Sequence, residues 1–339
     1  MSQHAAQHPI CLWQASTLRP QISYDRPRYP SGLLHTISGG ADQIPASTNW
    51  RETERREQLS PHAKVHRSTT AIWEEHPTLH GIEIEVLHGI AQAHEVEKLQ
   101  MDIWSGNDAW IVPSHALLIV SDYGGILLGA RIDSTLVGFV LGFLARSAGK
   151  LFHASHMLGV LPTSERRGIG AVLKLRQREI ALQQGLDLMR WTFDPLEARN
   201  AYFNLHKLGT VCRLYRPDYY GPMQDALNRD LPSDRLLVEW HLDDTEATVE
   251  PDVALQTILH DRAGLPELQL DNIQANLPVT IEIPRDLQVI KRDAPDVALL
   301  WRMAVRQAFS MSFDKGYVAR DFRDGAYVLM PQKEPGNEN

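Results

Sequence analysis

A glycine-containing basic loop is the part of this sequence best suited to chemistry. It reads ERRGIGA over Glu165 to Ala171 and opens a segment with helical periodicity. Two glycines at such a turn let backbone N–H groups approach an anion closely, and the positive end of the helix dipole adds to the attraction. Glu165 to Ile180 has five basic and two acidic residues, a net charge of +3, while the remaining chain carries −11. The loop is a predicted phosphate site, although its glycines could serve turn geometry alone.

The sequence contains no motif of the other common phosphate-binding sites and no pattern typical of covalent catalysis. A Rossmann fingerprint needs three glycines after the first strand, and a P-loop needs Gly-Lys-Ser/Thr; neither is present. Cys11 and Cys212 are the only cysteines, too few for a disulfide framework or a zinc site. Cys212 has no recognisable His/Asp partner. We therefore expect no metal and no covalent enzyme intermediate.

Candidates for proton transfer are few. Tyr202 and His206 lie four positions apart on a predicted short helix and so share a face. The alternative is that Tyr202 packs and His206 is a solvated helix-end residue. His153 and His156 have opposite strand parity, so at most one of them faces a cleft, where it could act as a base. A structural histidine is the alternative for both.

A Pro/Gly-rich loop predicted over Arg213 to Pro222 contains three tyrosines. Loop aromatics often contact substrate, but a packing cluster that pins the loop fits equally well. The helix around Trp301 is predicted to be core and is assigned no chemistry. The three loop tyrosines are Tyr215, Tyr219 and Tyr220.

The elements that must position these residues follow from the apolar pattern. A helix is predicted to follow the basic loop and to end at Gly185. Asp194, followed by a proline, is predicted to cap a short helix that runs to Gly209, with Glu197 completing the capping pattern. Five apolar runs are predicted as strands, the second and third as an antiparallel hairpin, at residues 116–120, 126–132, 135–145, 151–161 and 186–193. Residues 82–87 and 235–242 are also predicted as strands.

The 339 residues, 43% of them hydrophobic, are enough for one large or two modest cores. The first 78 residues carry seven of the 20 prolines and no sustained apolar period, so we expect them to be disordered. Residues 79–243 are predicted to form the functional domain and residues 244–278 a linker or insertion. Residues 279–339 are predicted to form a C-terminal helix and strand extension that packs on the domain.

The overall charge argues against two classes of partner. With a formal charge of −8, we expect neither nucleic acid nor an anionic membrane surface as a main partner. No apolar stretch approaches the roughly 20 residues that span a bilayer, and the N-terminus lacks the pattern of a secretion signal. We expect a cytoplasmic protein, and its oligomeric state does not follow from the pattern.

The segment MLGVLPTSERRGIGAVLKLRQREIALQQG, from Met157 to Gly185, resembles motif A of the GNAT acyl-CoA-dependent N-acyltransferases. The resemblance covers roughly Gly81 to Leu242, and WTFDPLEARNAYFNLHKLG resembles one uncharacterised branch of that superfamily. It implies an α/β (α+β) fold with a mixed, mostly antiparallel sheet flanked by helices. It also implies acetyl-CoA or another acyl-CoA as co-substrate and a small-molecule or peptide amine as acceptor.

The resemblance also implies roles for individual residues. In that family the loop amides and the helix N-terminus bind the pyrophosphate of coenzyme A. Val160 matches the strand residue whose N–H polarises the thioester carbonyl, and Asn200 best matches an asparagine that contacts the cofactor arm. The matching loop positions are Arg166, Arg167, Gly168, Ile169, Gly170 and Ala171.

Two positions depart from the family pattern. Glu165 puts a negative charge where an Arg or Gln usually begins the loop, so it must point away or be paired by an arginine. Leu205 occupies the place of the tyrosine general acid and cannot donate a proton. Tyr202 or His206 would have to replace that tyrosine.

These observations predict an N-acyltransferase, most simply an N-acetyltransferase, in which an amine attacks the thioester directly. A second hypothesis is a non-catalytic acyl-CoA-binding sensor or interaction module on the same scaffold, which Glu165 and Leu205 both favour. A third has an acyl carrier protein as donor and predicts binding that depends on Arg176 and Arg178.

Overall fold

The computed structural model describes residues 81–104, 111–165, 167–223, 230–243, 254–270, 273 and 277–332. All of them belong to one compact unit, Val65–Asn339. The expected disorder of residues 1–78 lies outside the described residues.

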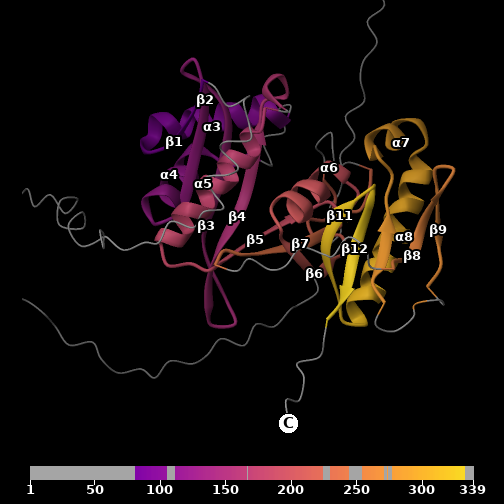
Figure 1. Ribbon diagram of the computed structural model, residues 1–339. Helices are drawn as coiled ribbons and strands as arrows, with labels where there is room; N and C mark the ends of the chain where they lie inside the picture. Colours follow the sequence, from indigo (N-terminus) through magenta and orange to yellow (C-terminus); the bar gives the residue numbers. More distant parts are fainter. Residues whose placement is uncertain are drawn as a thin grey trace, which may run out of the picture. The chain divides into compact units, whose positions relative to one another are not determined.

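The described strands form one continuous sheet in the order β1-β2-β3-β4-β5-β7-β6-β11-β12-β10-β8-β9 (Figure 1). Only the β4–β5 and β8–β10 pairs of this sheet are parallel, which confirms the predicted mixed, mostly antiparallel sheet. In chain order the strands are β1 (Ile82–Val86), β2 (Ile126–Ile132), β3 (Thr135–Ser147), β4 (Lys150–Val160), β5 (Leu188–Phe193), β6 (Val211–Arg216), β7 (Arg235–His241), β8 (Gln256–Arg262), β9 (Leu265–Leu268), β10 (Val279–Glu282), β11 (Tyr317–Arg323) and β12 (Ala326–Pro331).

Helices cover both faces of strands β1 to β4. Alternate residues of β2 face opposite sides: Leu128 packs in one cluster with Leu173 of α5, and Leu127 in another with Leu117 of α4. The described helices are α3 (Gly89–Trp104), α4 (Ser114–Asp122), α5 (Ile169–Gln183), α6 (Ala198–Ala201), α7 (Leu287–Asp293) and α8 (Pro295–Asp314), with the short turns η4 (Pro162–Ser164) and η5 (Tyr202–Lys207), the latter π-helical.

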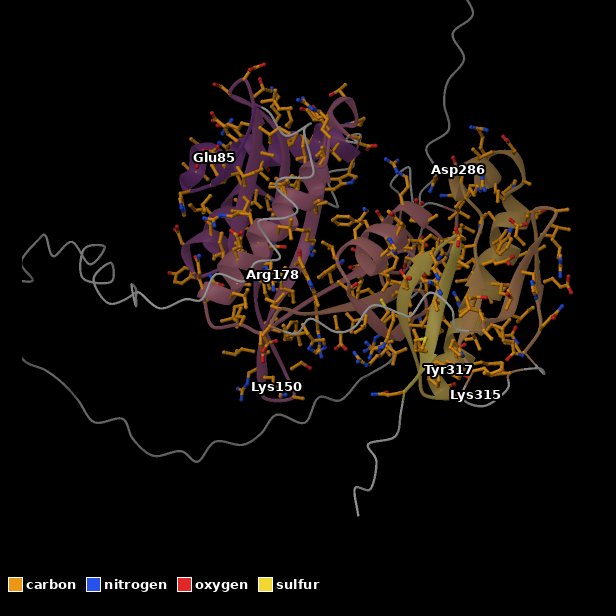
Figure 2. The ribbon with its side chains drawn as sticks, in the orientation of Figure 1. Glu85, Lys150, Arg178, Asp286, Lys315 and Tyr317 are labelled. Carbon is orange, nitrogen blue, oxygen red and sulfur yellow. The ribbon has the colours of Figure 1, made fainter. Side chains whose placement is uncertain are left out.

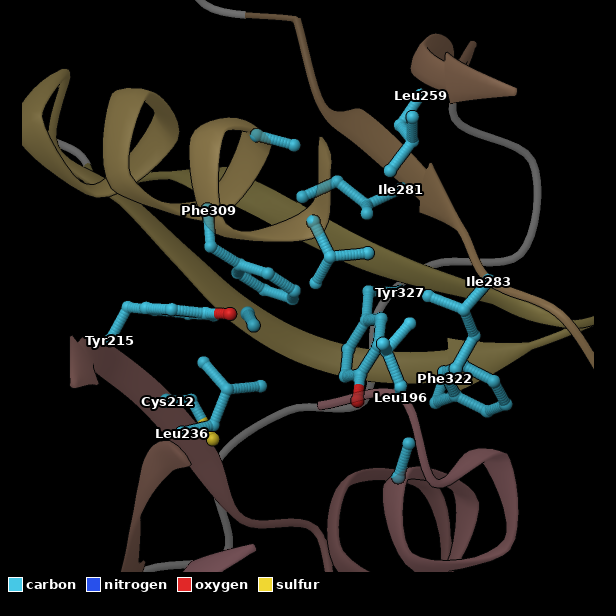
Figure 3. Packing of buried hydrophobic residues seen from close by; sticks show 14 of the residues in the cluster. Leu196, Cys212, Tyr215, Leu236, Leu259, Ile281, Ile283, Phe309, Phe322 and Tyr327 are labelled. Carbon is cyan, nitrogen blue, oxygen red and sulfur yellow. The ribbon is translucent and has the colours of Figure 1, made fainter. Parts of the chain in front are cut away.

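A second core lies between α8 and the strands from β6 onward. Trp301 and Phe309 of α8 are fully buried, and Phe309 makes an edge contact with the buried ring of Tyr327 on β12 (Figure 3). Tyr215 of β6 stacks on Phe309 at 5.7 Å between ring centroids. The predicted core role of the Trp301 helix holds for one face only, because Leu299, Leu300 and Met303, also expected in the core, are exposed.

One predicted strand is wrong. Residues 116–120 belong to helix α4, which Pro113 precedes as the N-cap residue. The run buries only one face, because Leu117 is fully buried while Ile119 is 56% exposed. An apolar run of this length fits a strand or a helix turn equally well, and the preceding proline was the signal for a helix start.

Three further boundaries differ from prediction. The start of the expected Arg213 loop is strand β6, and the range expected as a linker or insertion contains β8 and β9. The short helix begins later than predicted, at Ala198, with Glu197 as its N-cap residue. Asp194 does not cap it: its carboxylate accepts from the Leu196 amide and from Arg302 of α8. For Asp194, the difference depends on Arg302, which is distant in sequence.

Candidate functional site

Strand β4 parts from strand β5 before either strand ends. The two are paired only at His153 with Met189 and at Ala154 with Arg190. Strand β4 nevertheless continues to Val160, held on its other side by β3. From Ser155 to Val160 the edge of β4 that faces β5 therefore has no ladder partner within the described sheet.

The direction of the backbone amides along this edge follows from the register with β3. The Leu161 amide donates to the Val137 carbonyl at 2.8 Å, so Leu161 points toward β3. Because adjacent residues of an antiparallel strand point their N–H groups in opposite directions, Val160 and Leu158 point theirs away from β3, toward the open edge. Sequence analysis proposed Val160 as the amide donor but missed Leu158, which its parity with Val160 could have identified.

The loop after β4 leads directly into helix α5. Gly168 is the N-cap residue of α5 and has φ 79°, a left-handed conformation that glycine adopts without strain. A side chain at Gly138 of β3 would meet Ile169 at 3.1 Å and Val160 at 3.3 Å, so this glycine lets the helix start lie against the end of β4. The strand edge and the helix N-terminus are thus adjacent.

The first turn of α5 provides fewer free amides than predicted. The Ala171 amide donates to the Gly168 carbonyl at 3.0 Å, so it is already used inside the helix. Ile169 and Gly170 precede the first intrahelical bond, and no acceptor within the described residues takes the amides of Gly168, Ile169 or Gly170. Arg166 lies outside the described residues. The anion site proposed from the sequence therefore has three described glycine-loop amides at its centre.

The charge excess of this window is largely committed elsewhere. Arg178, labelled on α5 in Figure 2, donates to the Leu242 carbonyl, and Arg176 pairs with Glu179 at 2.7 Å. Lys174 is buried beneath the sheet. A sum of charges along a helix ignores which face each residue occupies, so the net +3 overstates the charge available at the loop.

The structure resolves the first departure noted in the sequence. Glu165 pairs with Arg199 of α6 at 3.2 Å, and both side chains are largely exposed. An exposed pair of this kind contributes at most about 1 kcal/mol, but it turns the carboxylate toward α6. Asn200 follows Arg199 and is exposed.

The two predicted proton donors lie together on η5. The rings of Tyr202 and His206 stack with their centroids 4.7 Å apart, and both side chains are about two-fifths exposed. His206 Nδ1 lies 2.9 Å from Asp321 Oδ1 on β11. Sequence analysis missed Asp321 because no local pattern links residues 115 positions apart. Leu205, in the family's acid position, is a buried core residue.

The other candidates have structural surroundings. His153 is fully buried, and burial together with the Lys174 charge lowers its pKa to about 4, so it stays neutral near pH 7; His156, on the opposite face, is exposed. Tyr215 is buried and donates to Asp234 at 2.7 Å, which pins the loop. Tyr219 and Tyr220 remain exposed by 52% and 40%.

Two classes of site find no support within the described part of the chain. No group of three or more His, Cys, Asp or Glu side chains there could hold a metal ion. None of the helices described is long and apolar enough to cross a membrane. Burial raises the pKa of the Cys212 thiol, which makes it a poor nucleophile.

The fold and site define an α/β protein with an opened strand edge beside a helix N-terminus. No family model matches the sequence, and no curated protein matches it. Solved acetyltransferases of the GNAT family are similar to part of the chain. The ribosomal-protein-S18-alanine N-acetyltransferase of Escherichia coli is 12% identical, covers 51% of this chain and 99% of its own, and has a TM-score of 0.39. A putative acetyltransferase from Salmonella typhimurium, solved with acetyl-CoA, is 17% identical over 49% and 97%, with a TM-score of 0.39. A GNAT acetyltransferase from Streptococcus pneumoniae is 15% identical over 47% and 97%, with a TM-score of 0.38.

Proposed function

We propose that this chain is an N-acyltransferase that moves an acyl group from acyl-CoA to an amine. The observation that carries the proposal is the open edge of β4, whose outward amides at Leu158 and Val160 lead to the first amides of α5, which have no acceptor among the described residues. Coenzyme A joins an amide-containing arm to a pyrophosphate. Its arm matches an unpaired strand edge, and its pyrophosphate matches a helix N-terminus.

The proposed reaction uses direct attack. The thioester carbonyl accepts a hydrogen bond from an outward amide of β4, that of Val160 or of the deeper Leu158, which stabilises the oxyanion as the amine nitrogen attacks the carbonyl carbon. The C–N bond forms, the C–S bond breaks, and the nitrogen loses a proton to water. His206 or Tyr202 supplies a proton to the departing sulfur. Holding both reactants together accounts for much of the rate gain.

We further propose that the domain of residues 79–243 depends on the extension of residues 279–339. Asp321 of the extension orients His206, and Arg302 of α8 binds Asp194 with two hydrogen bonds of 2.8 and 2.5 Å. Asp194 directly follows β5, so the extension fixes the segment that leads into α6.

The second candidate function is a non-catalytic acyl-CoA sensor, which the buried Leu205 favours because it leaves the family's acid position without a donor. Two measurements separate the candidates: calorimetry with coenzyme A, and release of free thiol from acetyl-CoA with a panel of amines, corrected for hydrolysis. The enzyme binds coenzyme A and releases thiol with at least one amine. Binding without thiol release would favour the sensor, and binding only to an acylated carrier protein would favour the third hypothesis.

The two donors are distinguished by matched variants. Because Asp321 orients His206, we expect His206→Ala to lower thiol release at saturating substrate roughly 100-fold, the scale of general acid catalysis. Tyr202→Phe keeps the ring that stacks on His206 and should change the rate only a few-fold. If both variants release thiol as fast as the wild-type protein, neither side chain donates the proton and water is the proton carrier.

A further inference from the structure

Four polar side chains are buried together where β4 and β5 part. His153, Ser155, Lys174 and Gln177 are each at most 5% exposed. Ser155 is the first residue of β4 beyond the last pair with β5, and Trp191 is the first such residue of β5. Lys174 Nζ lies 2.6 Å from Ser155 Oγ and 3.8 Å from the centroid of the Trp191 ring. The side-chain nitrogen of Lys174 therefore lies where β4 and β5 separate, at the inner end of the open edge of β4.

This cluster has more hydrogen-bond donors than acceptors. Ser155 donates to Gln177 Oε1 at 2.8 Å, which leaves Gln177 Nε2 and both ring nitrogens of His153 without partners in the part of the chain that the structure describes. Lys174 forms no ion pair there either. Lysine is almost never fully buried without an acidic partner, because an unpaired buried charge is costly.

Among the described residues, the cluster therefore has hydrogen-bond donors but no negatively charged group to accept from them. Burial lowers the pKa of Lys174 to about 7, and no carboxylate among the described residues counteracts this effect. A carboxylate placed beside Nζ would accept from Lys174 and from the unused Gln177 amide. Ser155 joins the two side chains, because its hydroxyl accepts from Lys174 and donates to Gln177.

We propose that Lys174, Ser155 and Gln177 form the blind end of the acyl site and select thioesters whose short acyl chain ends in a carboxylate, the succinyl class. This inference rests on the proposed function. Leu158, the deeper of the two outward amides, lies three residues from Ser155, so an acyl chain held there points its free end at the cluster. An acetyl group would be too short to reach it.

The protonation of Lys174 supplies an independent signature. At pH 8 the free protein holds this amine mostly unprotonated, since its pKa is about 7. A neighbouring carboxylate raises that pKa, so binding a carboxylate-bearing acyl-CoA takes up protons at pH 8. Below pH 6 the amine is protonated before and after binding, and the uptake disappears.

The test is calorimetry of the full chain with succinyl-CoA and butyryl-CoA, which share a four-carbon acyl chain and differ in the terminal carboxylate. Titrations at pH 8 in two buffers of different ionisation enthalpy report proton uptake. We expect succinyl-CoA to bind at least tenfold more tightly and to be the only one of the two with uptake. Lys174→Met should abolish both effects and retain affinity for coenzyme A. Lys150→Met, at an exposed lysine, should change neither.

The outcomes separate the inference from the function on which it rests. If the wild-type protein binds butyryl-CoA as tightly as succinyl-CoA, without proton uptake, the inference is overturned and the N-acyltransferase proposal stands. If no form of coenzyme A binds, the proposed function is overturned as well. The wild-type comparison decides even if Lys174→Met does not fold.

Discussion

Gly168→Val is expected to lower the affinity for coenzyme A by at least 100-fold. Gly168 has φ 79° at the start of α5, a conformation that a β-branched residue avoids. The turn would rearrange, and the amides of Ile169 and Gly170 would lose their shared direction. Hydrogen bonds to a charged acceptor are each worth about 1.5–3 kcal/mol, so losing two corresponds to at least the stated factor. Calorimetry with coenzyme A measures the change.

Gly185→Val provides the matched control at the other end of the same helix. Gly185 has φ 76° and open space around the position of a side chain, so valine pays a similar backbone cost there. Its amide donates to the Leu182 carbonyl and faces no proposed ligand. Both variants should lose a similar amount of thermal stability, but only Gly168→Val should lose affinity. An equal loss of affinity would mean that the loop holds no pyrophosphate.

Arg302→Met is expected to lower the free energy of unfolding by about 3–5 kcal/mol, the usual cost of removing one partner from a buried ion pair. Arg302 is 1% exposed and donates to both oxygens of Asp194. Burial lowers the pKa of Arg302, but Asp194 outweighs burial, and the net direction is upward. Without Arg302, the carboxylate keeps only Arg235, at 3.5 Å, as an ion-pair partner among the described residues. Urea unfolding followed by circular dichroism measures the loss.

Arg292→Met is the surface control for this experiment. Arg292 pairs with Asp293 at 2.7 Å, but both side chains are more than half exposed. Water replaces such a contact, so the urea midpoint of unfolding should not change measurably. If Arg302→Met and Arg292→Met lower the free energy of unfolding by the same amount, the buried pair would not anchor the extension.

Local patterns predicted the elements around the site well. The β2–β3 hairpin, the glycine turn and the left-handed Gly185 that follows the end of α5 depend on neighbouring residues, and the structure contains all three. Asp194 shows the limit of prediction from neighbouring residues. Its sequence matches a helix cap, but an arginine 108 residues away takes its carboxylate. Competition between a local and a distant partner cannot be judged from local sequence.

The candidate site shows the same division. The family resemblance pointed to Val160, but the parting of β4 from β5 is a property of two strands and is visible only in their register. Lys174 was counted as one of several basic residues near an anion site. Lys174 is buried, so it does not add to the charge at the loop. Its burial depends on contacts with Ser155 and Trp191, which belong to two other elements.

The long-range contacts of the extension have a consequence for biosynthesis. The ribosome delivers Arg302 and Asp321 more than 100 residues after the partners that they hold, Asp194 and His206. A nascent chain can build the strand edge and the glycine turn early, but it cannot anchor the segment beyond β5 or orient His206 until β11 has emerged. The proposed activity would therefore be withheld until β11 has left the ribosome.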